Sequence, residues 1–225
     1  MKFKNKFIGI IVILILIIFI GVKNPLVGLL NYKSTYSEMN TNSSKYIMLV
    51  NKQNALPLDY KPNLVMPRVK FLKDTRRESR LMDKIAAKAL EELFKVAKSE
   101  NIIFIGSSAY RSYKSQVEIF NDAIKLKGVD YANKYVAKPG KSEHQTGLTI
   151  DVTNETRAFH KNSPEAKWLA NNAHRFGFIL RYLEGKEDIT GYNYEPWHIR
   201  YVGKDAAKEI YGKNITLEEY LDDID

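Results

Sequence analysis

The sequence contains no cysteine and very few histidines. In a chain of 225 residues this excludes a disulfide framework, a thiol nucleophile, a lipid-modified N-terminal cysteine and any zinc site with Cys ligands. The lack of disulfides does not exclude export, because a chain of this length can build a core without them. Any histidine-based site must be drawn from only four residues, His144, His160, His174 and His198.

Internal repeats and low-complexity tracts are also absent. Hydrophobic residues make up 44% of the chain and charged residues 27%, which is typical of globular proteins and excludes wholesale disorder. The length allows one domain plus an appendage, or two very small domains.

One long hydrophobic run lies at the N-terminus. Lys2, Lys4 and Lys6 precede an uninterrupted apolar segment over residues 7–22, and Lys23 follows it. As a helix the segment would be about 24 Å long, somewhat shorter than the roughly 30 Å hydrocarbon core of a bilayer. No small-x-small cleavage site follows, so we expect a retained signal anchor and not a cleaved signal peptide.

This anchor sets the expected organisation of the chain. Lysines before the span place residues 1–6 in the cytoplasm, residues 7–22 across the membrane and the rest outside. Residues 23–44, whose second half is rich in Ser, Thr and Asn, are expected to be a tether. Residues 45–225 would then form an extracellular domain on a single-pass membrane protein.

The formal net charge of +9 falls to about +5 once the four lysines around the anchor are left out. The basic residues are spread along the chain and form no phosphate-tracking face, so we expect no nucleic-acid partner. A modest positive field suits an anionic cell wall, and solubility explains it equally well. We expect a monomer.

Local patterns predict a mixture of helices and strands. Apolar residues at three- and four-residue steps predict a first helix over Ser79–Ser99. Ser163 followed by Pro164 is typical of a helix start, and Thr216 with Glu219 forms a capping box. Helices are expected over 79–99, 114–127, 163–176, 204–211 and 216–222, and strands over 46–50, 102–105, 178–181 and 197–201. Without a regular βαβ rhythm, this favours an α+β fold.

Two segments carry polar residues that a folded core does not need. The first spans Lys141–Val152. From Gly147 onward it alternates, which places Leu148, Ile150 and Val152 on the core side and Asp151 on the opposite, polar face. His144 precedes this strand in a turn, where Gly147 permits a close approach.

The second segment spans Tyr194–Tyr201 and alternates too. Its pattern places His198 and Arg200 on the polar face and favours Trp197 on the opposite, core-facing side; the alternative is that Trp197 forms a wall of a cleft on the polar side. Pro196 interrupts the strand, so Glu195 need not follow the same facing.

If the two strands pair, His144, Asp151 and His198 can converge. Two imidazoles and a carboxylate are suitable ligands for Zn²⁺, with a fourth position left for water. Glu195 would lie beside that position, where a carboxylate can act as general base. Taken alone, each of these residues favours a structural role, but the concentration of two of the four histidines in these segments, beside polar partners, favours the metal site.

These residues resemble a known family. Ser142-x-His144-x-x-Gly147-x-x-x-Asp151, followed by Glu195-Pro196-Trp197-His198, is similar to the D-alanyl-D-alanine carboxypeptidases of the VanY type, which belong to the LAS zinc metallopeptidases. The segment Ser108–Tyr113, with Gln116, resembles the family's substrate-side motif. The resemblance covers about residues 45–212 and implies a LAS/hedgehog-like domain, with a central antiparallel sheet flanked by helices.

The resemblance implies a role for each matching residue. His144, Asp151 and His198 would hold zinc, Glu195 would be the general base, and Arg111 would contact the substrate or the oxyanion. Ser142 and Gln116 would be substrate neighbours. Apart from the resemblance, Tyr194 is expected to touch the substrate or to close the pocket. Leu148 stands where the family often has a small residue, but its core-side position leaves the site intact. A guanidinium at Arg111 also suits the free carboxylate that a carboxypeptidase must recognise.

The expected function is therefore that of a zinc-dependent D,D-carboxypeptidase, not a serine-type enzyme, acting on the D-Ala-D-Ala end of peptidoglycan stem peptides. The same residues leave other activities of the family open: an L,D-carboxypeptidase, a D,D-dipeptidase or an endopeptidase. A non-catalytic zinc-bearing module that binds the cell wall is a further alternative, against which the intact Glu195 argues.

Overall fold

The computed structural model describes residues 46–57 and 59–224. The expected anchor over residues 7–22 and tether over residues 23–44 lie outside these described residues. Within the described part, no helix has both the length and the apolar character needed to cross a membrane.

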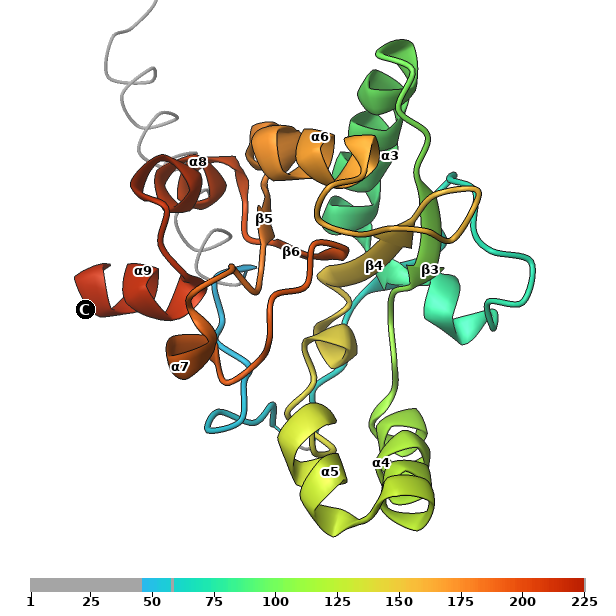
Figure 1. Ribbon diagram of the computed structural model, residues 1–225, viewed down its shortest axis with the longest axis vertical. Helices are drawn as coiled ribbons and strands as arrows, with labels where there is room; N and C mark the ends of the chain where they lie inside the picture. Colours follow the sequence, from blue (N-terminus) through green and yellow to red (C-terminus); the bar gives the residue numbers. More distant parts are fainter. Residues whose placement is uncertain (1–45, 58, 225) are drawn as a thin grey trace, which may run out of the picture. The chain divides into compact units, whose positions relative to one another are not determined.

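A four-stranded antiparallel sheet lies at the centre of the fold (Figure 1). Its strands follow the order β3-β4-β6-β5, with bounds β3 Ile105–Ser108, β4 Thr149–Thr153, β5 Phe178–Leu180 and β6 His198–Tyr201. The expected pairing of the two polar segments is confirmed, because Asp151 on β4 lies opposite His198 on β6. A second, two-stranded sheet pairs β1 (Leu64–Val65) with β2 (Met82–Asp83).

Helices surround this sheet. The α-helices are α3 Lys84–Ser99, α4 Tyr113–Lys127, α5 Val129–Tyr135, α6 Pro164–Asn172, α7 Glu187–Thr190, α8 Lys204–Lys213 and α9 Leu217–Ile224. Three 3₁₀ turns are η1 Glu78–Arg80, η2 Glu143–Thr146 and η3 Ala173–Phe176. The predicted caps are confirmed: the Ser163 side chain accepts a hydrogen bond from the backbone N–H of Ala166, and Thr216 and Glu219 cap one another reciprocally.

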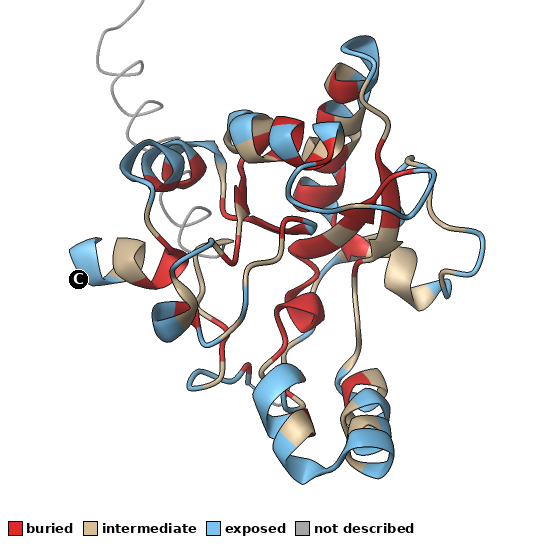
Figure 2. Ribbon diagram, in the orientation of Figure 1, coloured by how far each residue is buried: buried red, intermediate tan, exposed pale blue. Residues whose placement is uncertain are grey.

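The main core lies between one face of the sheet and helices α3 and α6 (Figure 2). Its residues from the β4 segment and β6 are ones predicted from the alternation: Leu148, Ile150 and Val152 from the first and Ile199 with Tyr201 from the second. A second apolar cluster joins α8 and the start of α9 to Ile179 and Val202. The opposite face of β4 and β6 is therefore free to carry polar chemistry. Helices α4 and α5 pack together on that side of the sheet (Figure 1).

Three predicted elements are placed differently. The first helix begins at Lys84 and not at Ser79, because Asp83 caps it by accepting from the N–H of Ile85, while Met82 pairs in β2. The strand predicted over residues 46–50 is absent, since the carbonyls of Tyr46 and Met48 accept hydrogen bonds from the Arg200 guanidinium instead of a neighbouring strand. The strand predicted over residues 102–105 starts at Ile105 and continues to Ser108.

Candidate active site

The three predicted metal ligands meet on the polar face of the sheet. Asp151 lies between the two histidines: its Oδ2 is 3.4 Å from Nε2 of His144, and its Oδ1 is 2.9 Å from Nδ1 of His198. The two imidazole rings are perpendicular, with centroids 5.1 Å apart. One ligand atom from each of the three residues lies within 4.8 Å of the others, a cluster in which a single cation can be held.

The backbone fixes the direction of the His144 ring. Its Nδ1 lies 2.7 Å from the carbonyl oxygen of Ala109, an acceptor, so Nδ1 donates and Nε2 faces Asp151 with its lone pair. Gly147 ends the turn at a φ of +73° and brings its carbonyl to the N–H of Asp83. A Cβ at Gly147 would lie 2.8 Å from Leu64, so the close approach predicted from the sequence requires glycine.

The charges of the three residues suit a divalent cation. Burial lowers the pKa of His144, which favours the neutral imidazole that a metal binds. Burial alone would raise the pKa of Asp151, but His144 and His198 hold it well below its usual range, so the carboxylate stays ionised. Two imidazoles and an ionised carboxylate, each held in place by its own neighbours, form a donor set that fits Zn²⁺.

Glu195 lies beside the cluster and not within it. Its Oε2 is 3.5 Å from Nδ1 of His198, and its side chain is about a third exposed to the cleft. Burial, together with the charges of Asp151 and Glu143, raises the pKa of Glu195, and His198 opposes part of this shift. A carboxylate with a raised pKa next to a metal position is suited to accept and return a proton.

Arg111 points into the same cleft from the start of α4. Its Nη1 donates to Gln116 Oε1 at 3.0 Å and its Nη2 to Ser108 Oγ at 3.3 Å, while Gln116 in turn donates to the carbonyl of Ala137. The guanidinium is thus held in one orientation near Asp151, whose charge is the main electrostatic partner of Arg111. In this geometry Gln116 anchors the Arg111 side chain.

A cleft of about 260 Å³ joins these groups. Beside the three candidate ligands, its lining includes Arg111, Gln116, Ser142, Tyr182, Tyr192, Glu195 and Trp197. The prediction that Trp197 packs behind the metal is wrong. Because β6 begins only at His198, Trp197 leaves the strand's alternation, is 37% exposed and lines the cleft.

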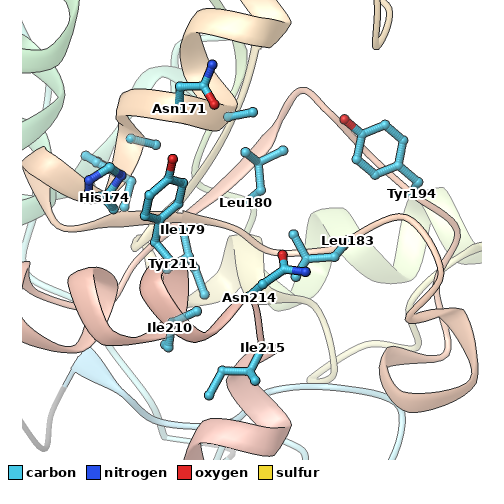
Figure 3. Close-up of a pocket in the computed structure, with 13 residues that line it drawn as sticks. Asn171, His174, Ile179, Leu180, Leu183, Tyr194, Ile210, Tyr211, Asn214 and Ile215 are labelled. Atoms are coloured by element: carbon cyan, nitrogen blue, oxygen red, sulfur yellow. The ribbon is translucent and has the colours of Figure 1, made fainter.

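Tyr194 is not among the residues that line this cleft. It borders a separate cavity of about 260 Å³ beside β5 and α8, shown in Figure 3. His174 lies in that cavity too, stacked on Tyr211 with ring centroids 3.8 Å apart, and His160 is exposed. The sequence-based assignment of Tyr194 to the substrate therefore has no support from its position, while both remaining histidines lie outside the metal cluster.

Sequence reasoning missed a cluster of buried charges behind the site, formed by Glu143, Arg181, Arg200 and Glu218. Both arginines are 0% exposed, and both donate to Glu143 Oε1 at 2.7 Å. The sequence contains one indication of this cluster, because the alternation places Arg200 on the same polar face of β6 as His198. A position on a polar face does not by itself show that the side chain is buried.

Comparison with known proteins agrees with this geometry. The family model described as VanY, D-alanyl-D-alanine carboxypeptidase, matches residues 79–204, more than half of the chain. The chain belongs to the VanY family. A curated relative, the "putative carboxypeptidase YodJ" of Bacillus subtilis, is 46% identical to this VanY-family chain over 189 residues, covering 81% of the chain and 69% of the relative.

Solved structures place this VanY-type carboxypeptidase among LAS domains. The LD-carboxypeptidase LdcB, whose structure concerns peptidoglycan recognition, has a TM-score of 0.75 and 46% identity, covering 79% of this chain and 86% of its own. A variant of the vancomycin-resistance D,D-pentapeptidase VanY, in complex with Zn(II), has a TM-score of 0.66 and 35% identity over 79% of this chain and 99% of its own.

Proposed function

We propose that this carboxypeptidase is a zinc-dependent D,D-carboxypeptidase that removes the terminal D-alanine from peptidoglycan stem peptides. The observation that carries the proposal is the convergence of His144, Asp151 and His198 with Glu195 and Arg111 around one cleft. The Zn(II) complex of the VanY relative supports zinc as the metal. An arrangement with a metal triad, an unliganded carboxylate and a fixed guanidinium is complete for hydrolysis of a peptide end.

The residues divide the chemistry between them. Zinc at the triad would activate a water molecule and polarise the scissile carbonyl. Glu195 takes a proton from the attacking water and returns it to the amine of the departing D-alanine. Arg111, held by Gln116 and Ser108, offers a planar fork to the free carboxylate of the substrate and so selects a chain end.

A second candidate is L,D-carboxypeptidase activity, in which D-alanine leaves from a tetrapeptide. The similarity to LdcB, higher in both identity and TM-score than the similarity to the D,D-pentapeptidase VanY, favours it. Both activities release a C-terminal D-alanine with its free carboxylate, so both use the same roles for Glu195 and Arg111.

We also propose that the protein works outside the cell membrane. The support is the pattern of residues 1–44, with three lysines, an apolar run over residues 7–22 and a polar stretch. Protease treatment of intact cells would digest the carboxypeptidase domain if this is right. Protection until the cells are lysed would refute it.

The activity can be tested on the full-length protein purified in detergent. It would be incubated, with and without a metal chelator, with a muramyl pentapeptide ending in D-Ala-D-Ala and, separately, with the tetrapeptide. Mass spectrometry would detect the loss of one alanine. Chelator-sensitive trimming of the pentapeptide supports the D,D assignment, and trimming of the tetrapeptide alone moves it to L,D. A zinc-loaded protein inert on both would refute the proposal and favour a wall-binding module.

A further inference from the structure

The ring of His198 lies between two carboxylates. Its Nδ1 faces Asp151 at 2.9 Å, on the side of the metal position. Its Nε2 is buried on the other side of the ring, has no hydrogen-bond partner within the usual limits among the described residues, and lies 3.5 Å from Oε2 of Glu143. Glu143 itself is not a candidate ligand, because the ring separates it from the metal position.

Glu143 is held in this place by two arginines from the sheet. Its Oε1 accepts 2.7 Å hydrogen bonds from Nε of Arg181, at the end of β5, and from Nη1 of Arg200, on β6. Its Oε2 accepts a hydrogen bond from the Thr149 hydroxyl at 3.4 Å and faces the His198 ring. Two charge-assisted hydrogen bonds of 2.7 Å from guanidiniums to one oxygen are those that a carboxylate accepts.

The guanidinium nitrogens that do not contact Glu143 have acceptors of their own. Glu218 from α9 accepts from both terminal nitrogens of Arg181, at 2.8 and 2.7 Å, and also from Asn51. Arg200 donates instead to the backbone carbonyls of residues 46 and 48. The two guanidiniums and two carboxylates cancel in charge, which is what a fully buried ionic cluster requires.

We propose that Glu143 is a positioning residue for the metal ligand His198. This inference rests on the proposed function, since it assumes a metal at the triad. A neutral imidazole carries one proton, and a metal needs the lone pair of Nδ1. The proton must then reside on Nε2, where the Glu143 carboxylate stabilises it, fixes the ring orientation and increases the basicity of Nδ1.

At His144 a backbone carbonyl plays the part that Glu143 plays at His198. There the nitrogen that does not face the triad donates to the carbonyl of Ala109. His198 has no such carbonyl, and a carboxylate supplied by the residue next to His144 takes its place. A cluster that served packing alone would gain nothing from directing the second oxygen of Glu143 at an imidazole, and apolar side chains of similar volume are often at least as stable.

The test compares the full-length wild type with Glu143→Gln and with Glu218→Gln as the matched control. Both variants neutralise one carboxylate of the same cluster, but Glu218 contacts Arg181 and not His198. Zinc affinity would be measured by competition with a chromophoric chelator, and ligand geometry by the visible spectrum of the Co(II) form. Glu143→Gln is expected to weaken zinc binding about 10–100-fold and to alter the Co(II) spectrum. Glu218→Gln is expected to lower the melting temperature of the metal-free protein but to keep affinity within roughly threefold.

Wild-type zinc affinity and spectrum in a folded Glu143→Gln protein would overturn the inference. An equal loss of affinity in Glu218→Gln would overturn it too, because the effect would then belong to the fold. If Glu143→Gln fails to fold, Glu143→Asp keeps the charge opposite the arginines but withdraws it from the ring, and the same loss of affinity is expected. A wild type that binds no zinc at all would instead refute the proposed function.

Discussion

Replacing Glu195 with glutamine should separate metal binding from catalysis. The side chain keeps its shape but can no longer accept a proton. Glu195 lies 3.5 Å from Nδ1 of His198, outside the three-residue cluster, and it is about a third exposed. The change should therefore alter the free energy of unfolding by less than about 1 kcal/mol and leave zinc content unchanged.

The expected effect on turnover follows from the role of a general base. Such a group contributes about 10²–10⁴-fold, so kcat should fall by that factor, equivalent to about 3–5 kcal/mol in the activation free energy. The assay is D-alanine release from the pentapeptide or tetrapeptide, whichever the wild type cleaves, together with zinc analysis of the purified proteins.

Two control variants should bracket the effect of Glu195→Gln. His198→Ala should lose both zinc and turnover, because it removes a ligand. Glu184→Gln changes an exposed glutamate that pairs with Lys161 and does not line the cleft, and should leave both unchanged. Turnover in Glu195→Gln within threefold of wild type would refute the assignment of Glu195 as the proton acceptor.

Three further predictions concern the same site. Arg111→Lys should lower kcat/KM about 10–100-fold with zinc content unchanged, because an ammonium cannot replace the fork held by Gln116; steady-state kinetics would check it. Gly147→Ala should lower the melting temperature by about 4–8 °C, from roughly 2 kcal/mol of strain at φ +73° and the contact with Leu64, measured by calorimetry. Burial opposes a proton on His198, but the hydrogen bond to Asp151 and the neighbouring carboxylates Glu143 and Glu195 raise its pKa to about 9. Zinc must displace that proton, so apparent affinity should rise about tenfold per pH unit up to pH 9 in chelator titrations, and an affinity independent of pH would contradict this.

The parts of the site that the sequence predicted correctly are those with local patterns. Strict alternation over residues 148–152 and 198–201 identifies the core side of each strand, and the polar residues then fall on the opposite face. The caps at Ser163 and Thr216 depend only on neighbours three residues away. The predicted ligand triad follows from these local patterns together with the motif.

The parts that the sequence did not predict depend on partners far along the chain. Arg181 and Glu218 are 37 residues apart, and nothing in either local pattern shows that both are buried. Residues 46–50 form a continuous apolar run typical of a buried strand, but Arg200 donates to the carbonyls of Tyr46 and Met48 and no strand ladder forms. The alternation of β6 begins only at His198, so it does not fix the position of Trp197, which lines the cleft.

The position of Glu218 in α9, close to the C-terminus, has a consequence for the synthesis of the protein. Glu143, Arg181 and Arg200 are all made earlier, and burying the two arginines with Glu143 as their one counter-charge would leave an unbalanced positive charge in a low-dielectric interior. The charge cluster behind the cleft should therefore assemble only once translation has passed Glu218 in α9. A growing chain that has not yet reached Glu218 therefore lacks the balanced charge cluster behind the cleft, and a chain cut before Glu218 would leave Arg181 without that counter-charge.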